Sequence, residues 1–150
     1  MYQHVLVPLD GSATAEAAMP HAEALARQGG ARLTLLRVLP PPDSYVIPEA
    51  VFVDREQVMR SLEAEALGYL RAVRERLEGG GLTVRTTTRV GDAATAILDT
   101  ARAVGADLIV MATHGRSGLG RWALGSVADR VVRAAGVPVL LVRPSEPPPG

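Results

Sequence analysis

A glycine-rich segment near the C-terminus carries the clearest chemical pattern in the chain. Residues 112–126 contain four glycines, which let backbone amides approach a ligand without obstruction by a Cβ atom. Gly125 and Ser126 stand where an apolar, helix-periodic segment begins, and the free N–H groups of a helix start suit phosphate oxygens. Ser126 and Asp129 fit a capping box at that start. The segment predicts a phosphate-binding loop, although the same glycines would also serve a long turn that binds nothing.

A second polar turn follows the first apolar run of the chain. Residues 4–9 read as a buried strand, and Asp10-Gly11-Ser12 closes it. The Asp10 carboxylate can accept hydrogen bonds from a ligand. It can also cap the loop or the helix that comes next. The residues alone leave both roles open.

The elements that must position these two turns alternate along the chain. Strands are predicted at 4–9, 32–38, 82–90, 107–112 and 137–143, and helices at 14–28, 54–78, 93–104 and 127–135. This alternation predicts an α/β fold, a doubly wound five-stranded parallel sheet with helices on both faces. In the strand order 3-2-1-4-5, the ends of the first and fourth strands meet at the crevice where such sheets bind ligands. We expect one domain over residues 1–143, a long loop at 40–53 and a flexible Pro-rich tail at 144–150.

Composition excludes several classes of function. The chain has 150 residues, and its 16 basic residues balance 16 acidic ones, which argues against a nucleic-acid partner. It has no cysteine and no lysine, so thiol chemistry, Walker-type loops and Schiff bases are excluded. No apolar run approaches the ~20 residues of a membrane span, and no cationic leader precedes the first strand. We therefore expect a cytoplasmic protein that does not bind membranes.

Over residues 4–143 the chain resembles the universal stress proteins of the single-domain, ATP-binding kind. The resemblance rests on Val7-Pro8-Leu9-Asp10-Gly11-Ser12, on Val127-Ala128-Asp129-Arg130-Val131 and on the terminal run 137–142. The family's nucleotide signature is Gly, two residues, Gly, nine residues, then Gly-Ser or Gly-Thr. Gly115, Gly125 and Ser126 match it at the right spacing, whereas Ala112 replaces the first glycine. The resemblance implies an adenine nucleotide alpha hydrolase-like fold.

The resemblance also implies a role for each matching position. Asp10 would bind the ribose hydroxyls, and Pro8, Val38 and Met111 would line the adenine slot. The phosphates would lie against Gly115, Gly125, Ser126 and the backbone N–H of Val127. At Ala112 a methyl group fits if the backbone is extended and is strained if φ is positive.

Three functions are compatible with these residues. The first is an ATP-binding regulatory protein of the stress response with little or no turnover, with or without Mg²⁺ and with an unknown protein partner. The second is a slow ATPase or autokinase, and the third is a nucleotide-free protein-interaction module. The last strand is apolar on both faces and would be an exposed edge. Because family members pair this strand, the resemblance implies a homodimer through Val137–Arg143.

Overall fold

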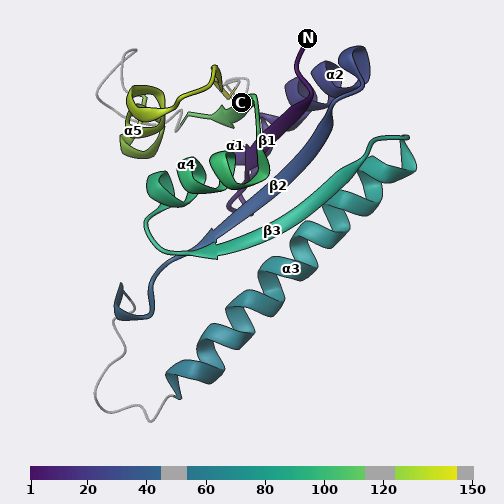
Figure 1. Ribbon diagram of the computed structural model, residues 1–150. Coiled ribbons are helices and arrows are strands. Elements are labelled where there is room, and N and C mark those ends of the chain that lie inside the picture. Colours follow the sequence, from purple (N-terminus) through teal and green to yellow (C-terminus); the bar gives the residue numbers. More distant parts are fainter. Residues whose placement is uncertain (45–53, 114–123, 145–150) are drawn as a thin grey trace, which may run out of the picture.

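The computed structural model describes residues 1–44, 54–113 and 124–144, and its centre is one parallel sheet (Figure 1). The strands lie side by side in the order β3-β2-β1-β4-β5, so the predicted order is confirmed. All four strand pairings are parallel. The strands are β1 (His4–Pro8), β2 (Arg32–Leu39), β3 (Val84–Val90), β4 (Leu108–Ala112) and β5 (Val139–Val142).

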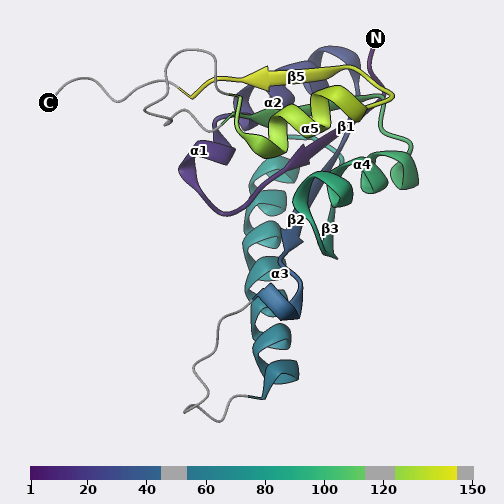
Figure 2. The same cartoon turned by 90° about the vertical axis from the view of Figure 1, so that its left-hand side faces the viewer.

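Helices cover both faces of the sheet, as predicted. The helices are α1 (Ala13–Glu16), α2 (Met19–Gly29), α3 (Arg55–Gly79), α4 (Ala93–Val104) and α5 (Ser126–Ala134), with a 3₁₀ turn at Pro42–Ser44. Buried side chains of α2 and α3 pack with β1 and β2 in one core, and those of α4 and α5 pack with β1 and β4 in another. The N-terminal half of α3 projects beyond the end of the sheet (Figures 1 and 2).

The alternation of side chains along the two central strands explains this two-sided burial. Val5 and Val7 of β1 face the α2 and α3 side, whereas Leu6 faces the α4 and α5 side. All three are fully buried. A strand covered on both faces needs a continuous apolar run, which is why the central strands could be recognised in the sequence.

The helix predicted over residues 14–28 is wrong as a single element. It is divided into α1 and α2, and the chain between them makes two short-range bonds, from the Ala17 N–H to the Thr14 carbonyl and from the Ala18 N–H to the Ala15 carbonyl. Pro20 explains the break, because it has no N–H to donate and its ring would clash with the carbonyl four residues earlier. The break leaves α1 as a separate short turn of helix beside the end of β1.

The strand ends differ slightly from the prediction. Asp107 precedes β4, and its carboxylate accepts from the N–H groups of Gln3 and His4 at 2.8 and 3.0 Å. Pro138 likewise precedes β5, which begins at Val139. On its outer side, β5 pairs with no other strand of the described residues. Of the predicted loop 40–53 and tail 144–150, residues 45–53 and 145–150 lie outside the described part of the chain. No described helix combines the length and the hydrophobicity of a membrane span.

Candidate functional site

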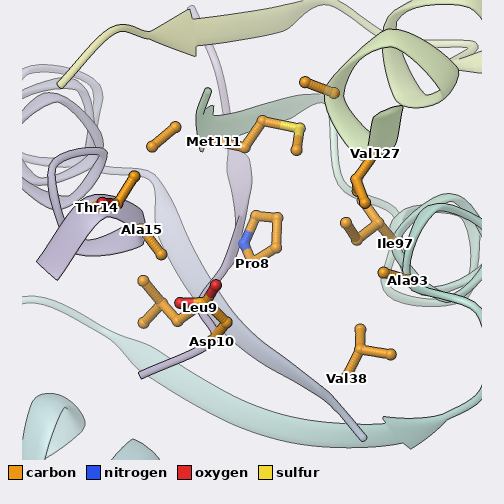
Figure 3. A pocket seen from close by; sticks show the side chains of 12 residues that line it. Pro8, Leu9, Asp10, Thr14, Ala15, Val38, Ala93, Ile97, Met111 and Val127 are labelled. Carbon is orange, nitrogen blue, oxygen red and sulfur yellow. The ribbon is translucent and has the colours of Figure 1, made fainter. Parts of the chain in front are cut away.

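A pocket opens at the carboxyl ends of the central strands, between β1 and β4 (Figure 3). Its floor is the Pro8 ring, which Figure 3 places between a wall from α1 and a wall from α4 and α5. This is the point at which the order of the strands reverses, where open α/β sheets bind their ligands. The described lining residues are Pro8, Leu9, Asp10, Thr14, Ala15, Val38, Ala93, Ile97, Met111, Ala112, Val127 and Ala128.

The structure brings most of the predicted binding residues to this pocket. Six of them line it: Pro8, Asp10, Val38, Met111, Ala112 and Val127. Gly125 and Ser126 are not among the lining residues, but they directly precede Val127 at the start of α5. Gly115 lies outside the residues that the structure describes.

The remaining lining residues were not found from the sequence. Thr14 and Ala15 come from α1, Ala93 and Ile97 from the first turns of α4, and Leu9 and Ala128 neighbour predicted residues. The turn Gly91-Asp92 could have indicated α4, since it opens a helix at the same edge of the sheet as Asp10. Among the described lining residues only Asp10 and Thr14 have polar side chains, so the pocket is apolar with one polar rim.

The Asp10 carboxylate is held by its own loop. Its Oδ1 atom accepts from the Ser12 N–H at 2.8 Å and from the Ser12 hydroxyl at 2.5 Å. Ser12, in turn, caps α1 by accepting from the Ala15 N–H at 3.1 Å. Of the two capping roles left open for Asp10, the structure has the one in its loop, where it accepts from Ser12, whereas the helix cap is Ser12. The carboxylate itself is exposed at the rim of the pocket.

The capping box predicted from Ser126 and Asp129 is wrong. The N-cap of α5 is Gly125, and no side chain of the described residues caps the helix. Gly125 has φ 83° and ψ 151°, a conformation that is nearly restricted to glycine and that starts the helix one residue earlier than predicted. Asp129 instead accepts from the Arg133 guanidinium at 3.0 Å. Among the described residues, no side chain accepts from the first N–H groups of α5, which lie beside the pocket wall.

A charged contact joins the two helices that form one wall. Asp92 caps α4 by accepting from the N–H and hydroxyl of Thr95, and it also accepts from the Arg130 guanidinium of α5 at 2.8 and 2.9 Å. The hydrogen bonds from Thr95 and the charge of Arg130 hold the pKa of Asp92 below its usual value. Both helices are therefore fixed relative to each other at the ends that carry Ala93 and Val127.

Ala112, which replaces a glycine of the signature, is the last residue of β4. It pairs with Val142 of β5, so its backbone is extended, and no described residue other than glycine has a positive φ. Its methyl group packs partly into the core and also lines the pocket. The methyl group of Ala112 therefore stands on an extended backbone and causes no strain there.

No group of three or more histidine, cysteine or carboxylate side chains that could hold a metal ion occurs within residues 1–44, 54–113 and 124–144. The site consists of an apolar slot, a carboxylate at its rim and a helix start at its wall. An apolar slot suits a planar ring system, a carboxylate suits hydroxyl donors, and a helix start suits an anion.

Comparison with known proteins matches almost the whole chain. Residues 1–143 match the model of the universal stress protein family. Universal stress protein MJ0531 of Methanocaldococcus jannaschii is 33% identical over 149 residues, which cover 95% of this chain and 83% of that protein. The solved structure of MJ0577 from the same organism has a TM-score of 0.82 and 29% identity and covers 98% of this chain and 99% of its own. A universal stress protein solved in complex with cAMP has a TM-score of 0.71 and 27% identity, covering 96% of this chain and 98% of that one.

Proposed function

Because this chain belongs to the universal stress protein family, we propose that its pocket binds an adenine nucleotide, with ATP as the ligand. The observation that carries the proposal is the pocket between β1 and β4, where an apolar slot, a carboxylate and a helix start lie together. The solved relative in complex with cAMP adds support, since its ligand also contains adenine, ribose and phosphate.

Each part of the nucleotide has a matching surface in this arrangement. The adenine ring would lie over Pro8, between the apolar side chains of Val38 and Met111. Val38 is partly buried, and Met111 is buried. The ribose hydroxyls would donate to Asp10 at the rim. The phosphates would accept from the first N–H groups of α5, at Ser126 and Val127, where the helix dipole favours negative charge.

The site residues fit Mg²⁺ only as a companion of the nucleotide. Mg²⁺ in nucleotide sites is held by the phosphates and by one or two carboxylates. Asp10 is the only carboxylate among the described lining residues, and its Oδ1 atom is engaged by Ser12. We therefore propose that ATP binds with or without Mg²⁺, and that Asp10 serves the ribose in both cases.

The same residues favour a binding protein over an enzyme. Phosphoryl transfer needs groups that position the nucleophile and neutralise developing charge. Asp10 and Thr14 are the polar side chains of the described lining, and the chain has no lysine. We propose a regulatory protein of the stress response, acting in the cytoplasm, that binds ATP with little or no turnover and presents the bound state to a protein partner.

The test is to denature the purified protein, look for released nucleotide, and titrate the stripped protein with Mg-ATP by calorimetry. We expect stoichiometric binding that Asp10→Ala weakens by roughly 10- to 150-fold, the effect of losing hydrogen bonds to a charged group. Asp99→Ala is the matched control, because Asp99 is an exposed carboxylate that pairs with Arg102 on the surface of α4.

Two other results would favour the alternatives. Steady phosphate release that disappears in Ser126→Ala would favour a slow ATPase or autokinase. A stripped protein that binds nothing at millimolar ATP would favour a nucleotide-free interaction module.

We also propose that the protein is a homodimer that pairs through residues 137–143. β5 is an edge of the sheet, and Leu140 at its centre is 37% exposed although it is a large apolar residue. Val139 and Leu141, on the other face of the strand, are partly buried. An edge strand of this kind is usually protected, and a second copy of the same strand would protect it.

A further inference from the structure

A cluster of polar side chains lies under the Asp10 loop on the face of the sheet away from the pocket. Val38 of β2 lines the pocket, so the preceding residue, Arg37, points to the opposite face. There its guanidinium lies over the ring of Tyr69, with Cζ at 5.3 Å from the ring centroid. Tyr69 belongs to α3, and its hydroxyl donates to Glu16 of α1 at 2.9 Å. The cluster therefore joins β2, α3 and α1.

The guanidinium of this cluster lies beside the loop that carries Asp10. A Cβ atom added at Gly11 would lie 3.1 Å from Arg37 Nη1 and 3.5 Å from Cζ. Gly11 has φ 87°, so it is the residue at which the loop turns. Because Gly11 has no Cβ atom, the guanidinium can lie beside the loop without a tight contact at this position.

Asp10, Gly11 and Ser12 are tied together, because the N–H and the hydroxyl of Ser12 both donate to the Asp10 carboxylate. A group that fixes Gly11 therefore also fixes the direction of that carboxylate. Arg37 is well suited to this task, since a planar guanidinium stacked on an aromatic ring keeps fewer conformations than a free one.

The surroundings of Tyr69 set the protonation of its hydroxyl. Burial, together with the hydrogen bond to Glu16 and its charge, raises the pKa of Tyr69 to about 12. The positive charge of Arg37 acts against this rise, and the negative charge of Asp10 adds to it. Tyr69 therefore keeps its proton over the physiological range, so its hydroxyl can donate to Glu16 throughout that range.

We infer that Arg37, held on the Tyr69 ring, is a positioning residue that keeps the Asp10 carboxylate aimed at the ribose hydroxyls of the nucleotide. The inference rests on the proposed function, and it concerns side chains outside the pocket lining. It means that ribose recognition depends on the opposite face of the sheet.

The test compares two ligands rather than one. ATP offers both ribose hydroxyls to Asp10, whereas 2′,3′-dideoxy-ATP offers neither, so the ratio of the two affinities isolates the Asp10 contact. We expect Arg37→Met to lower this ratio by roughly threefold to tenfold, mainly by weakening ATP binding. Tyr69→Leu should act in the same direction, because it removes the ring that holds the guanidinium. Asp10→Ala should bring the ratio close to one, and adding Arg37→Met to it should change the ratio no further.

Arg74→Met is the matched control, because Arg74 is an exposed arginine on the same helix as Tyr69 and pairs only with Glu78 among the described ion pairs. Equal losses for both ligands in Arg37→Met, with a native circular dichroism spectrum, would mean that Arg37 only stabilises the fold and would overturn the inference. An unchanged ratio in both Arg37→Met and Tyr69→Leu would overturn it as well. A wild-type protein that binds neither ligand would instead overturn the proposed function, and this inference with it.

Discussion

Replacing Gly125 by alanine tests how the start of α5 serves the site. Gly125 is the N-cap of α5, with φ 83° and ψ 151°. Its two successors, Ser126 and Val127, carry the N–H groups that we assign to the phosphates. An alanine at this position must either keep a conformation that residues with a Cβ atom avoid, or move the first turn of the helix.

The expected magnitude follows from that conformation. A non-glycine residue in this region costs on the order of 1–3 kcal/mol. If the protein keeps its geometry, a loss of roughly 2 kcal/mol in the free energy of unfolding lowers Tm by about 4–8 °C for a chain of this size. If the helix start moves instead, the same free energy appears as nucleotide affinity, which falls by roughly 30-fold for 2 kcal/mol. The two losses together should therefore amount to about 1–3 kcal/mol.

The assay measures both quantities on the same samples, by thermal unfolding without ligand and by calorimetric titration with Mg-ATP. Gly105→Ala is the matched control. Gly105 ends α4 with φ 70° and ψ 35°, and a Cβ atom there would meet no described atom within 4 Å. It should lower Tm, since the left-handed conformation costs about 1–2 kcal/mol, and leave the affinity unchanged.

Two results would refute this reasoning. If Gly125→Ala has the Tm and the affinity of the wild type, the conformation of residue 125 is not strained for alanine. If it loses stability as Gly105→Ala does but binds Mg-ATP normally, the start of α5 does not hold the phosphates.

Three further predictions concern the rim of the pocket, the core and the edge of the sheet. Thr14→Val should weaken ATP binding by about fivefold, the effect of one neutral hydrogen bond, and an unchanged calorimetric affinity would show that the threonine hydroxyl does not reach the ligand. His4 is buried, and its burial together with the positive charge of Arg32 lowers its pKa below 6.5. As the pH falls, the unfolded chain therefore takes up a proton at this histidine before the folded chain does. The free energy of unfolding should fall as the pH drops below about 6.5. Urea unfolding between pH 7 and 5 should show this loss in the wild type and in His21→Gln, an exposed control, but less of it in His4→Gln. Leu140→Asp should turn the dimer into a monomer in light scattering at micromolar concentration. Leu67→Asp should leave the dimer intact, although Leu67 is 39% exposed and Leu140 is 37% exposed. A wild-type protein that is a monomer would contradict the dimer proposal.

The strand order could be predicted because two signals in the sequence agree. Apolar runs bounded by glycine or proline mark the strands, and alternation with helix-periodic segments requires parallel crossovers. Choosing the order 3-2-1-4-5 then placed the Asp10 turn beside the end of β4, where the pocket is found. The topology of the sheet, inferred from the sequence, thus predicted the location of this pocket.

The errors arose where one residue overrides a regular pattern. The apolar spacing over residues 14–28 is helical on both sides of Pro20, so periodicity alone cannot reveal that the proline divides the segment. At α5 the pattern of Ser126 and Asp129 resembles a capping box, but Gly125 adopts a conformation open to few other residues and becomes the cap. In both cases backbone sterics decide against a side-chain preference.

The lining from α1 and α4 could not be read from the sequence because it depends on contacts between distant segments. Ala93 and Ile97 have ordinary apolar side chains in a helix whose sequence does not distinguish a pocket wall from a core. The contact between Arg37 and Tyr69 could not be predicted from the sequence either, because the two residues are 32 positions apart. They meet only because α3 packs across β2.

The two motif positions Ala112 and Gly125 show that glycine serves two different purposes within one signature. At 125 the backbone has a positive φ, so the position requires glycine for conformational reasons. At 112 the backbone is extended and paired to β5, so a methyl group costs no backbone strain and only occupies space at the pocket edge. Replacement of the first glycine therefore introduces no backbone strain at the end of β4, and we expect its effect on binding to come from the space that the methyl group occupies in the pocket.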